Sequence, residues 1–450
     1  MEKIQQVDLA MMLDARERRS FRQRELLEQY QRPLISFSMN IAGPVKNTPL
    51  IRRGFTEGRR QLLERIREAG GKILFQEETD EATGCEGMYI TDLDEQKIKQ
   101  LTCAVEEETA AGRLYDMDVI DTCGNKLERP APRRCLICGK PAKECARSRT
   151  HSVAELQEAT GRVLKESLDQ SDRNIIASRT VQALLYEVCV TPKPGLVDRN
   201  DSGSHADMDI YTFMASASAL WPYFASCAET GMESAELPAP ETLKRLRDPG
   251  KEAERRMYRM TAGINTHKGA IFSMGILCAA FGRLAPQDRY DPDQVLAEAA
   301  AMTAGITERE LHGVNAETAV TAGQKIYAEY GIAGIRGEAE AGFPAVREHG
   351  LPVLEEGLKS EKSRDEAGRA ALLAIIASTP DTNMIHRGGI ALQKKTAAQA
   401  AEILKNNAYP DADTMAQLNA EYINERLSPG GSADLLAVCW LMHFLKEERA

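Results

Sequence analysis

Two aspartates in the first third of the chain have the spacing of a divalent-cation site. They lie in Arg113-Leu-Tyr-Asp116-Met-Asp118-Val-Ile-Asp121, a segment whose apolar residues predict a β-strand. Side chains two residues apart on a strand project from the same face, so Asp116 and Asp118 would lie together. Such a pair can coordinate Mg²⁺ between itself and a polyphosphate substrate. The alternative is an edge strand that carries two solvated acids.

A second candidate site lies where a glycine turn at residues 43–44 leads into a predicted helix that begins at Pro49. Lys46 precedes this helix, and Arg52 and Arg53 lie just inside it. The N-terminus of a helix carries partial positive charge, and nearby cations add to it, so phosphate binding is expected there. The alternative is an ordinary turn with surface arginines.

Three cysteines and a histidine form a possible zinc site. Cys135, Cys138, Cys145 and His151 follow the pattern C-x2-C-x6-C-x5-H, and a glycine follows the second cysteine. Three thiolates and one imidazole would complete a tetrahedral zinc shell. There is no second Cys-x-x-Cys pair, however, and a reduced, metal-free turn that helps to hold substrate is the alternative.

In the second half of the chain, two consecutive polar loops interrupt helical sequence. Two prolines and a glycine fix the first, 191–199, in an extended form, and the second, 202–209, opens the next predicted helix. Ser204 and Asp207 could be only an N-cap and a first-turn acid, which would leave the other polar residues unassigned. The candidates for ligand binding or proton transfer are Lys193, Asp198, His205, Asp207 and Asp209.

A third polar group, Asn265-Thr-His267-Lys268, lies within an otherwise apolar stretch. Burying four consecutive polar side chains is costly without partners, so a bound ligand is favoured over a purely structural network. A glycine-rich turn further on carries Arg336 and Glu338. Two more polar segments, 379–389 and 428–434, are individually typical of loops or helix caps.

The sequence predicts two domains. Residues 1–155 alternate helices with short strands and should form an α+β domain, whereas residues 156–450 are rich in amphipathic segments and should be all-helical. Separate helices are expected over 153–168 and 172–190, and one helical stretch over 250–282.

Composition limits the possible partners and location of the 450-residue chain. A net charge of −10 argues against nucleic acid, and no run of apolar residues is long enough for a transmembrane helix. The N-terminus is charged, unlike a secretory signal. Of the ten cysteines three cluster and the rest are scattered, which favours a reducing cytoplasm.

The first domain resembles the citrate lyase holo-acyl-carrier-protein synthases, a nucleotidyltransferase-like family. The resemblance covers nearly all of residues 5–155 and is carried by segments 36–47, 112–119 and 134–151. It implies that phosphoribosyl-dephospho-CoA is transferred to a serine of the apo acyl-carrier (γ) subunit, with loss of pyrophosphate. Mg²⁺ bound by Asp116 and Asp118 would then stabilise the negative charge that develops as pyrophosphate leaves. Lys46, Arg52 or Arg53 would neutralise the released pyrophosphate.

The second domain is similar to triphosphoribosyl-dephospho-CoA synthases across roughly residues 172–445. The segments that carry the resemblance are 187–198, 202–209, 265–269, 334–338 and 428–434. It implies that the 2′-hydroxyl of 3′-dephospho-CoA attacks ribose C1′ of ATP and releases adenine. Oxocarbenium-like charge would be stabilised by Asp207, Asp209 or Asp198. The triphosphate, with Mg²⁺, would be bound by Lys193, His205, His267, Lys268 and Arg336. Asn265 and Glu338 would also bind substrate.

Other functions compete with this interpretation. The same chemistry could serve malonate decarboxylase, or water could replace the CoA hydroxyl, as in a nucleosidase or ADP-ribosyl hydrolase. A non-catalytic, carrier-binding assembly factor would explain the helices and loops but not the polar clusters.

Overall fold

A computed structural model describes residues 5–315 and 317–449 and confirms the two-domain layout. The chain divides into compact units between Ser171 and Asp172. This boundary falls inside α5 (Val153–Cys189), beyond residue 155, where the composition changes. The two helices expected over this region are one continuous helix, because residues 153–189 contain no proline and a single, tolerated glycine.

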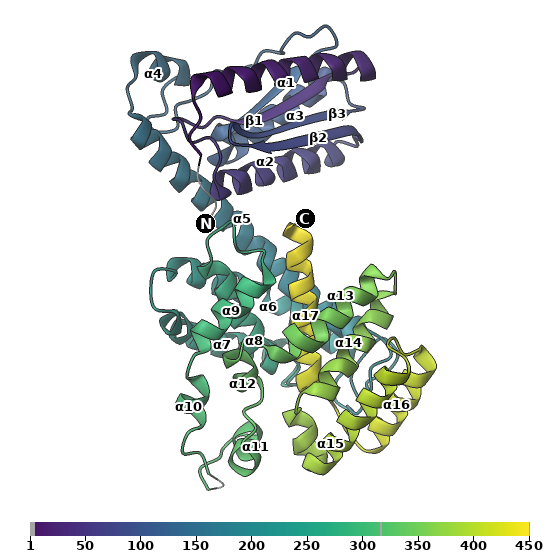
Figure 1. Ribbon diagram of the computed structural model, residues 1–450. Helices are drawn as coiled ribbons and strands as arrows, with labels where there is room; N and C mark the ends of the chain where they lie inside the picture. Colours follow the sequence, from purple (N-terminus) through teal and green to yellow (C-terminus); the bar gives the residue numbers. More distant parts are fainter. Residues whose placement is uncertain (1–4, 316, 450) are drawn as a thin grey trace. The chain divides into compact units, whose positions relative to one another are not determined.

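The first unit is built on a four-stranded antiparallel sheet with the order β2-β3-β1-β4 (Figure 1). Its strands are β1 (Leu34–Met39), β2 (Ile73–Glu81), β3 (Gly84–Thr91) and β4 (Tyr115–Ile120). Its helices are α1 (Leu9–Tyr30), α2 (Pro49–Glu68), α3 (Glu95–Glu108), the 3₁₀ turn η1 (Ala111–Leu114), α4 (Ala142–Ser148) and the first part of α5. The predicted α+β character is confirmed, and the likeness to nucleotidyltransferases stays a prediction.

Each face of this sheet is covered by helices. Phe37 of β1 and Met117 of β4 point into the larger core with residues of α2, α3 and the first part of α5. The other face packs against α1 through Leu26 and Leu27, as Figure 1 shows for that helix. Because side chains alternate along a strand, Asp116 and Asp118 project on the α1 side, opposite Ser38 and Ser36 of β1 in the antiparallel register.

The second unit contains helices and no strand among the residues described. After the second part of α5 come α6 (Ile210–Glu233), α7 (Ala239–Met260), α8 (Lys268–Arg283), α9 (Pro292–Thr303), α10 (Ile306–Leu311), α11 (Ala322–Tyr330), α12 (Ile335–Glu340), the π-helical turn η2 (Ala345–Gly350), α13 (Leu351–Lys359), α14 (Arg364–Ser378), α15 (Thr382–Asn406), α16 (Ala412–Asn424) and α17 (Gly430–Arg449). The core is formed above all by α8, α14 and α17, whose central residues are buried on every side. The prediction of an all-helical domain is confirmed.

The helical stretch expected over 250–282 is interrupted. Helix α7 ends at Met260 and α8 starts at Lys268. Ala262 and Gly263 between them have φ values of 53° and 90°, which end a right-handed helix. The four polar residues 265–268 therefore lie in a loop that leads to a helix start. None of the described helices combines the length and apolarity needed to cross a bilayer.

Candidate active sites

The second unit contains a cavity of about 530 Å³ whose wall is built from loops and helix starts. Helices α8, α15 and α17 all begin at this wall, with Lys268, Thr382 and Gly430 as their first residues. Helix N-termini present backbone N–H groups and partial positive charge, so the cavity is suited to an anionic ligand. The wall segments lie within residues 184–197, 205–213, 265–269, 334–338, 379–387 and 428–437.

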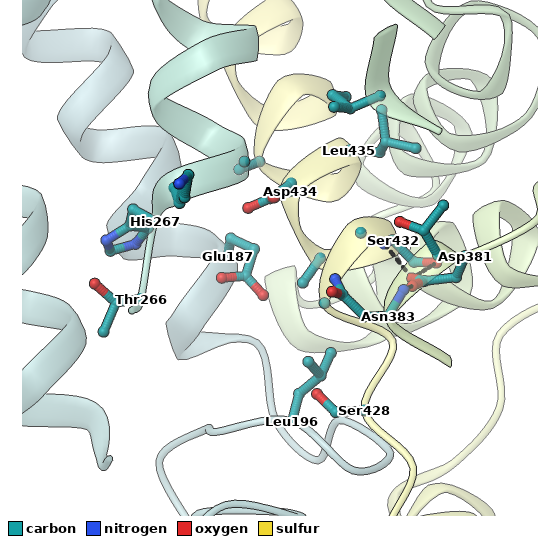
Figure 2. A pocket seen from close by; sticks show the side chains of 18 of the residues that line it. Glu187, Leu196, Thr266, His267, Asp381, Asn383, Ser428, Ser432, Asp434 and Leu435 are labelled. Atoms are coloured by element: carbon teal, nitrogen blue, oxygen red, sulfur yellow. Dashed lines mark hydrogen bonds between the residues drawn. The ribbon is translucent and has the colours of Figure 1, made fainter. Parts of the chain in front are cut away.

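Two carboxylates, Glu187 and Asp434, project into this cavity between His267 on one side and Asn383 on the other (Figure 2). Glu187 forms an ion pair with Lys193, whose ammonium also donates to the Glu187 carbonyl at 2.7 Å. Lys193 is 1% exposed, so this pair is shielded from water. Burial raises the pKa of Glu187, and the Lys193 charge opposes the rise.

Asp434 has no such cation. None of the described residues donates a hydrogen bond to its carboxylate, and burial raises its pKa well above the usual value, with smaller contributions from Glu187 and Asp381. Burial without a cation therefore favours the protonated form of Asp434. Its Oδ2 approaches the first turn of α8 so closely that an added Cβ at Gly269 would lie only 2.0 Å away.

His267 is a neutral imidazole, and one of its two ring nitrogens has no hydrogen-bond partner among the described residues. Its Nδ1 lies 2.7 Å from Ser216 Oγ, which itself accepts from Thr266 Oγ1 at 2.8 Å. In the tautomer in which Ser216 donates to Nδ1, the imidazole hydrogen is on Nε2. That Nε2 is buried and has no partner among the residues described. Burial lowers the pKa of His267 to about 3, so the ring stays uncharged.

Three other polar side chains lie at the cavity wall. His205 Nε2 lies 2.9 Å from Ser428 Oγ, and its pKa is lowered by burial and by the nearby Arg387. Lys268 is half exposed and its Nζ lies 3.2 Å from Glu254 Oε2. Asp381 accepts from Ser432 N at 2.7 Å and from Asn383 N at 2.8 Å, so it ties the starts of α15 and α17 together.

In the first unit, Asp116 and Asp118 lie in an ionic network at the free edge of β4. Asp116 Oδ1 is 2.8 Å from Arg133 Nη2, and Asp118 Oδ2 is 2.5 Å from Lys126 Nζ. Glu106 of α3 accepts from Met117 N at 2.8 Å, which satisfies an edge N–H of the strand. The side chains of Asp116 and Asp118 are 40% and 32% exposed, so a ligand can reach both.

The cations predicted near the start of α2 do not join this network. Arg52 Nε lies 3.2 Å from Asp80 Oδ2, and Asp80 is in register with Cys85, whose side chain faces the α2 side of the sheet. Arg53 pairs with Glu57 of its own helix at 3.7 Å. Both arginines are thus on the face opposite Asp116. Lys46 donates to the Ile41 carbonyl at 2.5 Å, and burial lowers its pKa.

The four residues of the predicted zinc site come together. One ligand atom each of Cys135, Cys138, Cys145 and His151 lies within 4.8 Å of every other, and Cys138 Sγ is 3.4 Å from Cys145 Sγ. A hydrogen bond from His151 is the main cause that lowers the pKa of Cys138 to about 6.

Comparisons with known proteins divide the chain at the same place as the structure. Residues 7–167 match the family of apo-citrate lyase phosphoribosyl-dephospho-CoA transferases (CitX), and residues 173–450 match the family of ATP:dephospho-CoA triphosphoribosyl transferases (CitG). Protein CitXG of Haemophilus influenzae is 34% identical over 448 residues, which are 96% of this chain and 95% of that protein. The chain belongs to the CitXG family. Protein CitXG of Leuconostoc mesenteroides subsp. cremoris is 31% identical, with 96% of each chain covered.

A further relative matches part of the chain. The probable 2-(5''-triphosphoribosyl)-3'-dephosphocoenzyme-A synthase of Citrobacter koseri is 42% identical over 265 residues, 58% of this chain and 87% of that protein. The CitXG-family chain is thus a bifunctional transferase that joins two activities in the biosynthesis of the citrate lyase prosthetic group, with ATP and dephospho-CoA as substrates. This agrees with the resemblance seen in the sequence and favours citrate lyase over malonate decarboxylase.

The cavity of this CitXG-family chain gathers many of the residues proposed from sequence. The proposed residues at its wall are Lys193, His205, Asp207, Asn265, His267, Lys268 and Glu338.

Three proposed residues are not at the wall. Asp209 is the N-cap of α6 and accepts from Thr212 N at 2.9 Å. Asp198 accepts from Lys193 N at 2.8 Å and Asn200 N at 2.7 Å, so it braces its own loop. Arg336 Nε donates to Glu310 at 2.7 Å.

Sequence reasoning missed the central carboxylates. Glu187 lies in the apolar last turns of α5, where an acid that must be buried is itself a signal of a partner or a function. Asp434 follows Pro429-Gly-Gly, a segment that was interpreted as a helix cap. In the first unit, Glu106, Lys126 and Arg133 were also missed, since nothing in their local sequence indicates that they meet at the edge of β4.

Proposed function

We propose that the cavity of the second unit transfers the 5-triphosphoribosyl group of ATP to the 2′-hydroxyl of 3′-dephospho-CoA. The observation that supports this most directly is the pair of carboxyl groups with different environments: Glu187 is paired with Lys193, whereas burial raises the pKa of Asp434, which has no ion pair among the described residues. A reaction in which a nitrogen base leaves and a hydroxyl attacks needs one acid and one base. The two environments provide both.

Asp434 acts as the general acid. As the bond between ribose C1′ and adenine N9 breaks, the electron pair goes to the base, and Asp434 gives a proton to a ring nitrogen so that adenine leaves neutral. Glu187 takes the proton of the attacking 2′-hydroxyl, and its negative charge stabilises the oxocarbenium-like transition state. A proton that passes from Glu187 to Asp434 through water restores both groups.

The starts of α8 and α17 bind the triphosphate. Their N–H groups supply partial positive charge, and Lys268 and Arg387 at the wall add full charges. In the tautomer with its hydrogen on Nε2, His267 donates to a substrate oxygen, because Nε2 has no partner among the described residues. Asp207 is an exposed acid at the wall and would hold Mg²⁺ together with phosphate oxygens. When bound, Mg²⁺ supplies charge neutralisation for the triphosphate.

The test of this half is adenine release from ATP by the full chain, followed by chromatography. We expect release to require 3′-dephospho-CoA and to fall by at least about 100-fold in Glu187→Gln and Asp434→Asn, the size of effect expected for a lost acid or base. Glu236→Gln, an exposed change in the same unit, is the control. Equal release with water alone would show a hydrolase, and undiminished release in both variants would remove the carboxylates from the mechanism.

For the first unit, we propose that Asp116 and Asp118 hold Mg²⁺ while a serine of the apo acyl-carrier (γ) subunit of citrate lyase attacks the α-phosphate of the triphosphate intermediate. The bond to pyrophosphate breaks, and the carrier keeps phosphoribosyl-dephospho-CoA. The two exposed carboxylates on one face fit a cation that takes its other ligands from phosphate and water. Arg133 and Lys126, now paired with these aspartates, would then contact phosphate oxygens.

Mass spectrometry of the carrier tests this half. The full chain is given purified triphosphoribosyl-dephospho-CoA, so that the first reaction is bypassed. We expect Asp116→Asn and Asp118→Asn to lose the mass gain on the carrier while adenine release is unchanged, and we expect Glu64→Gln, an exposed change on α2, to keep both. Transfer at the normal rate in both aspartate variants would refute the metal site.

A further inference from the structure

The Cys–His cluster of the first unit has the geometry of a metal site. In tetrahedral zinc sites with three sulfur ligands, neighbouring sulfurs are about 3.8 Å apart, since each Zn–S bond is about 2.3 Å. Cys138 Sγ and Cys145 Sγ are 3.4 Å apart, and all four ligand atoms are within 4.8 Å of one another. Shifts of about 1 Å or less would therefore bring the four ligands to bonding positions.

The backbone already has the turn that such a site requires. Cys135 N donates to the Lys140 carbonyl at 2.6 Å, and Gly139 N donates to the Cys135 carbonyl at 3.1 Å. Gly139 has φ of 71°, a value that glycine adopts without strain and that lets the turn close behind the two cysteines. Cys145 comes from α4 and His151 from the residues before α5, so separate segments converge.

The surrounding segment has almost no core of its own. Between residues 121 and 152, Cys135 and Cys145 are the buried members of the apolar core that the structure describes. His151 Nε2 is buried without a partner among the described residues. Leu127 and Leu136 are only partly buried against the core of the first unit, so a disulfide or a metal would add to the stability of this segment. All ten cysteines are free in the structure, so a metal remains.

We propose that Cys135, Cys138, Cys145 and His151 bind one structural Zn²⁺ and that this ion keeps Arg133 in place beside Asp116. Three thiolates and an imidazole select zinc over magnesium or calcium, and four protein ligands leave no open position for catalysis. Arg133 lies two residues before the first ligand, and its carbonyl accepts from Ala142 N at 2.8 Å within the same turn. Its side chain lies 2.8 Å from Asp116 and 2.6 Å from Glu106.

Metal content tests the site without reference to activity. The full chain, purified without added metal, should contain about one zinc per chain by elemental analysis, and Co²⁺ exchange should give the visible bands of a tetrahedral thiolate site. Cys138→Ser should lose the ion, whereas Cys123→Ser, which changes an exposed cysteine outside the cluster, should keep it. His151→Cys retains four ligands and should also keep zinc. A purified chain without metal, or with a Cys138–Cys145 disulfide, would overturn the proposal.

The link to Arg133 rests on the transferase function proposed above and is tested separately. Cys138→Ser should reduce transfer to the carrier by at least about 10-fold when the triphosphate intermediate is supplied, while adenine release by the same chain stays normal. Zinc loss with normal transfer would overturn the link to Arg133. In Asp116→Asn, zinc content should be unchanged, so a failure of the metal proposal and a failure of the Asp116 proposal give different results.

Discussion

Replacing Gly269 by alanine should damage the synthase activity through a single contact. The new Cβ would lie 2.0 Å from Asp434 Oδ2. Carbon and oxygen atoms that are not bonded stay at least about 3 Å apart, so the carboxyl group must move by about 1 Å or more. Because Asp434 is anchored in a buried helix start, this movement displaces the proposed acid from its working position.

A displacement of this size has consequences for rate and for stability. A misplacement of about 1 Å commonly costs about 100-fold in rate, so we expect kcat/KM for adenine release to fall by about that factor. Overpacking of a buried site lowers the free energy of unfolding by about 1–3 kcal/mol. The higher helix propensity of alanine offsets at most about 1 kcal/mol of this loss.

The chain offers a matched control for this substitution. Gly323 lies in α11 with no atom near its added Cβ, so Gly323→Ala should keep adenine release and raise the free energy of unfolding by about 0.4–1 kcal/mol. Adenine release and thermal unfolding are measured on both variants. Transfer to the carrier from supplied intermediate should be normal in both. A folded Gly269→Ala chain with full adenine release would show that the Asp434 position has no part in the reaction.

Three further predictions concern residues of the second unit. Lys193→Met leaves Glu187 buried without its cation and should lower the free energy of unfolding in urea by about 3–5 kcal/mol. Asp209→Asn should retain most adenine release, since asparagine is an equally good N-cap. Asp209→Ala should lower the free energy of unfolding by about 1 kcal/mol. A roughly 100-fold loss of adenine release in the asparagine variant would contradict a role limited to capping. In the unfolded chain His267 binds a proton near pH 6.5, but in the folded chain only near pH 3. The free energy of unfolding therefore falls as the pH drops from 6.5 towards 3, by up to about 1.4 kcal/mol per pH unit. Urea unfolding is measured at several pH values between 4 and 7. The free energy of unfolding should change less with pH in His267→Gln than in the unaltered chain, and an equal pH dependence would refute the lowered pKa of His267.

The fold classes could be read from local pattern because they depend on short-range periodicity. The strands around Asp116 alternate apolar and polar residues, and the helices after residue 172 repeat apolar residues at helical spacing. The predictions that were wrong concern where helices begin and end. Ala262 adopts positive φ in a stretch without strong helix breakers before it, and α5 continues where the composition changes. Helix ends of this kind depend on tertiary packing, which local sequence does not contain.

The candidate sites divide in a similar way. Residues in loops rich in glycine and proline, such as Lys193 and His205, were found because unusual side chains stand out there. Glu187 and Asp434 were missed because each is one acid on a buried helix, and only the packing of α5, α8 and α17 makes them face one cavity. Arg52 was expected to neutralise pyrophosphate, and the sequence does not reveal that it lies 3.2 Å from Asp80, on the face of the sheet opposite Asp116.

The continuous helix α5 limits how the two activities can be separated. Val163 and Leu164 on its earlier turns belong to the core of the first unit. Asp172, the first residue of the second, is buried and pairs with the buried Arg289 at 3.0 Å. A synthase fragment that starts one residue later would leave that guanidinium without this carboxylate, and a transferase fragment that stops at residue 155 would expose apolar core. A transferase fragment therefore has to extend past Leu164, and a synthase fragment has to begin at or before Asp172, so both ends fall within the same helix.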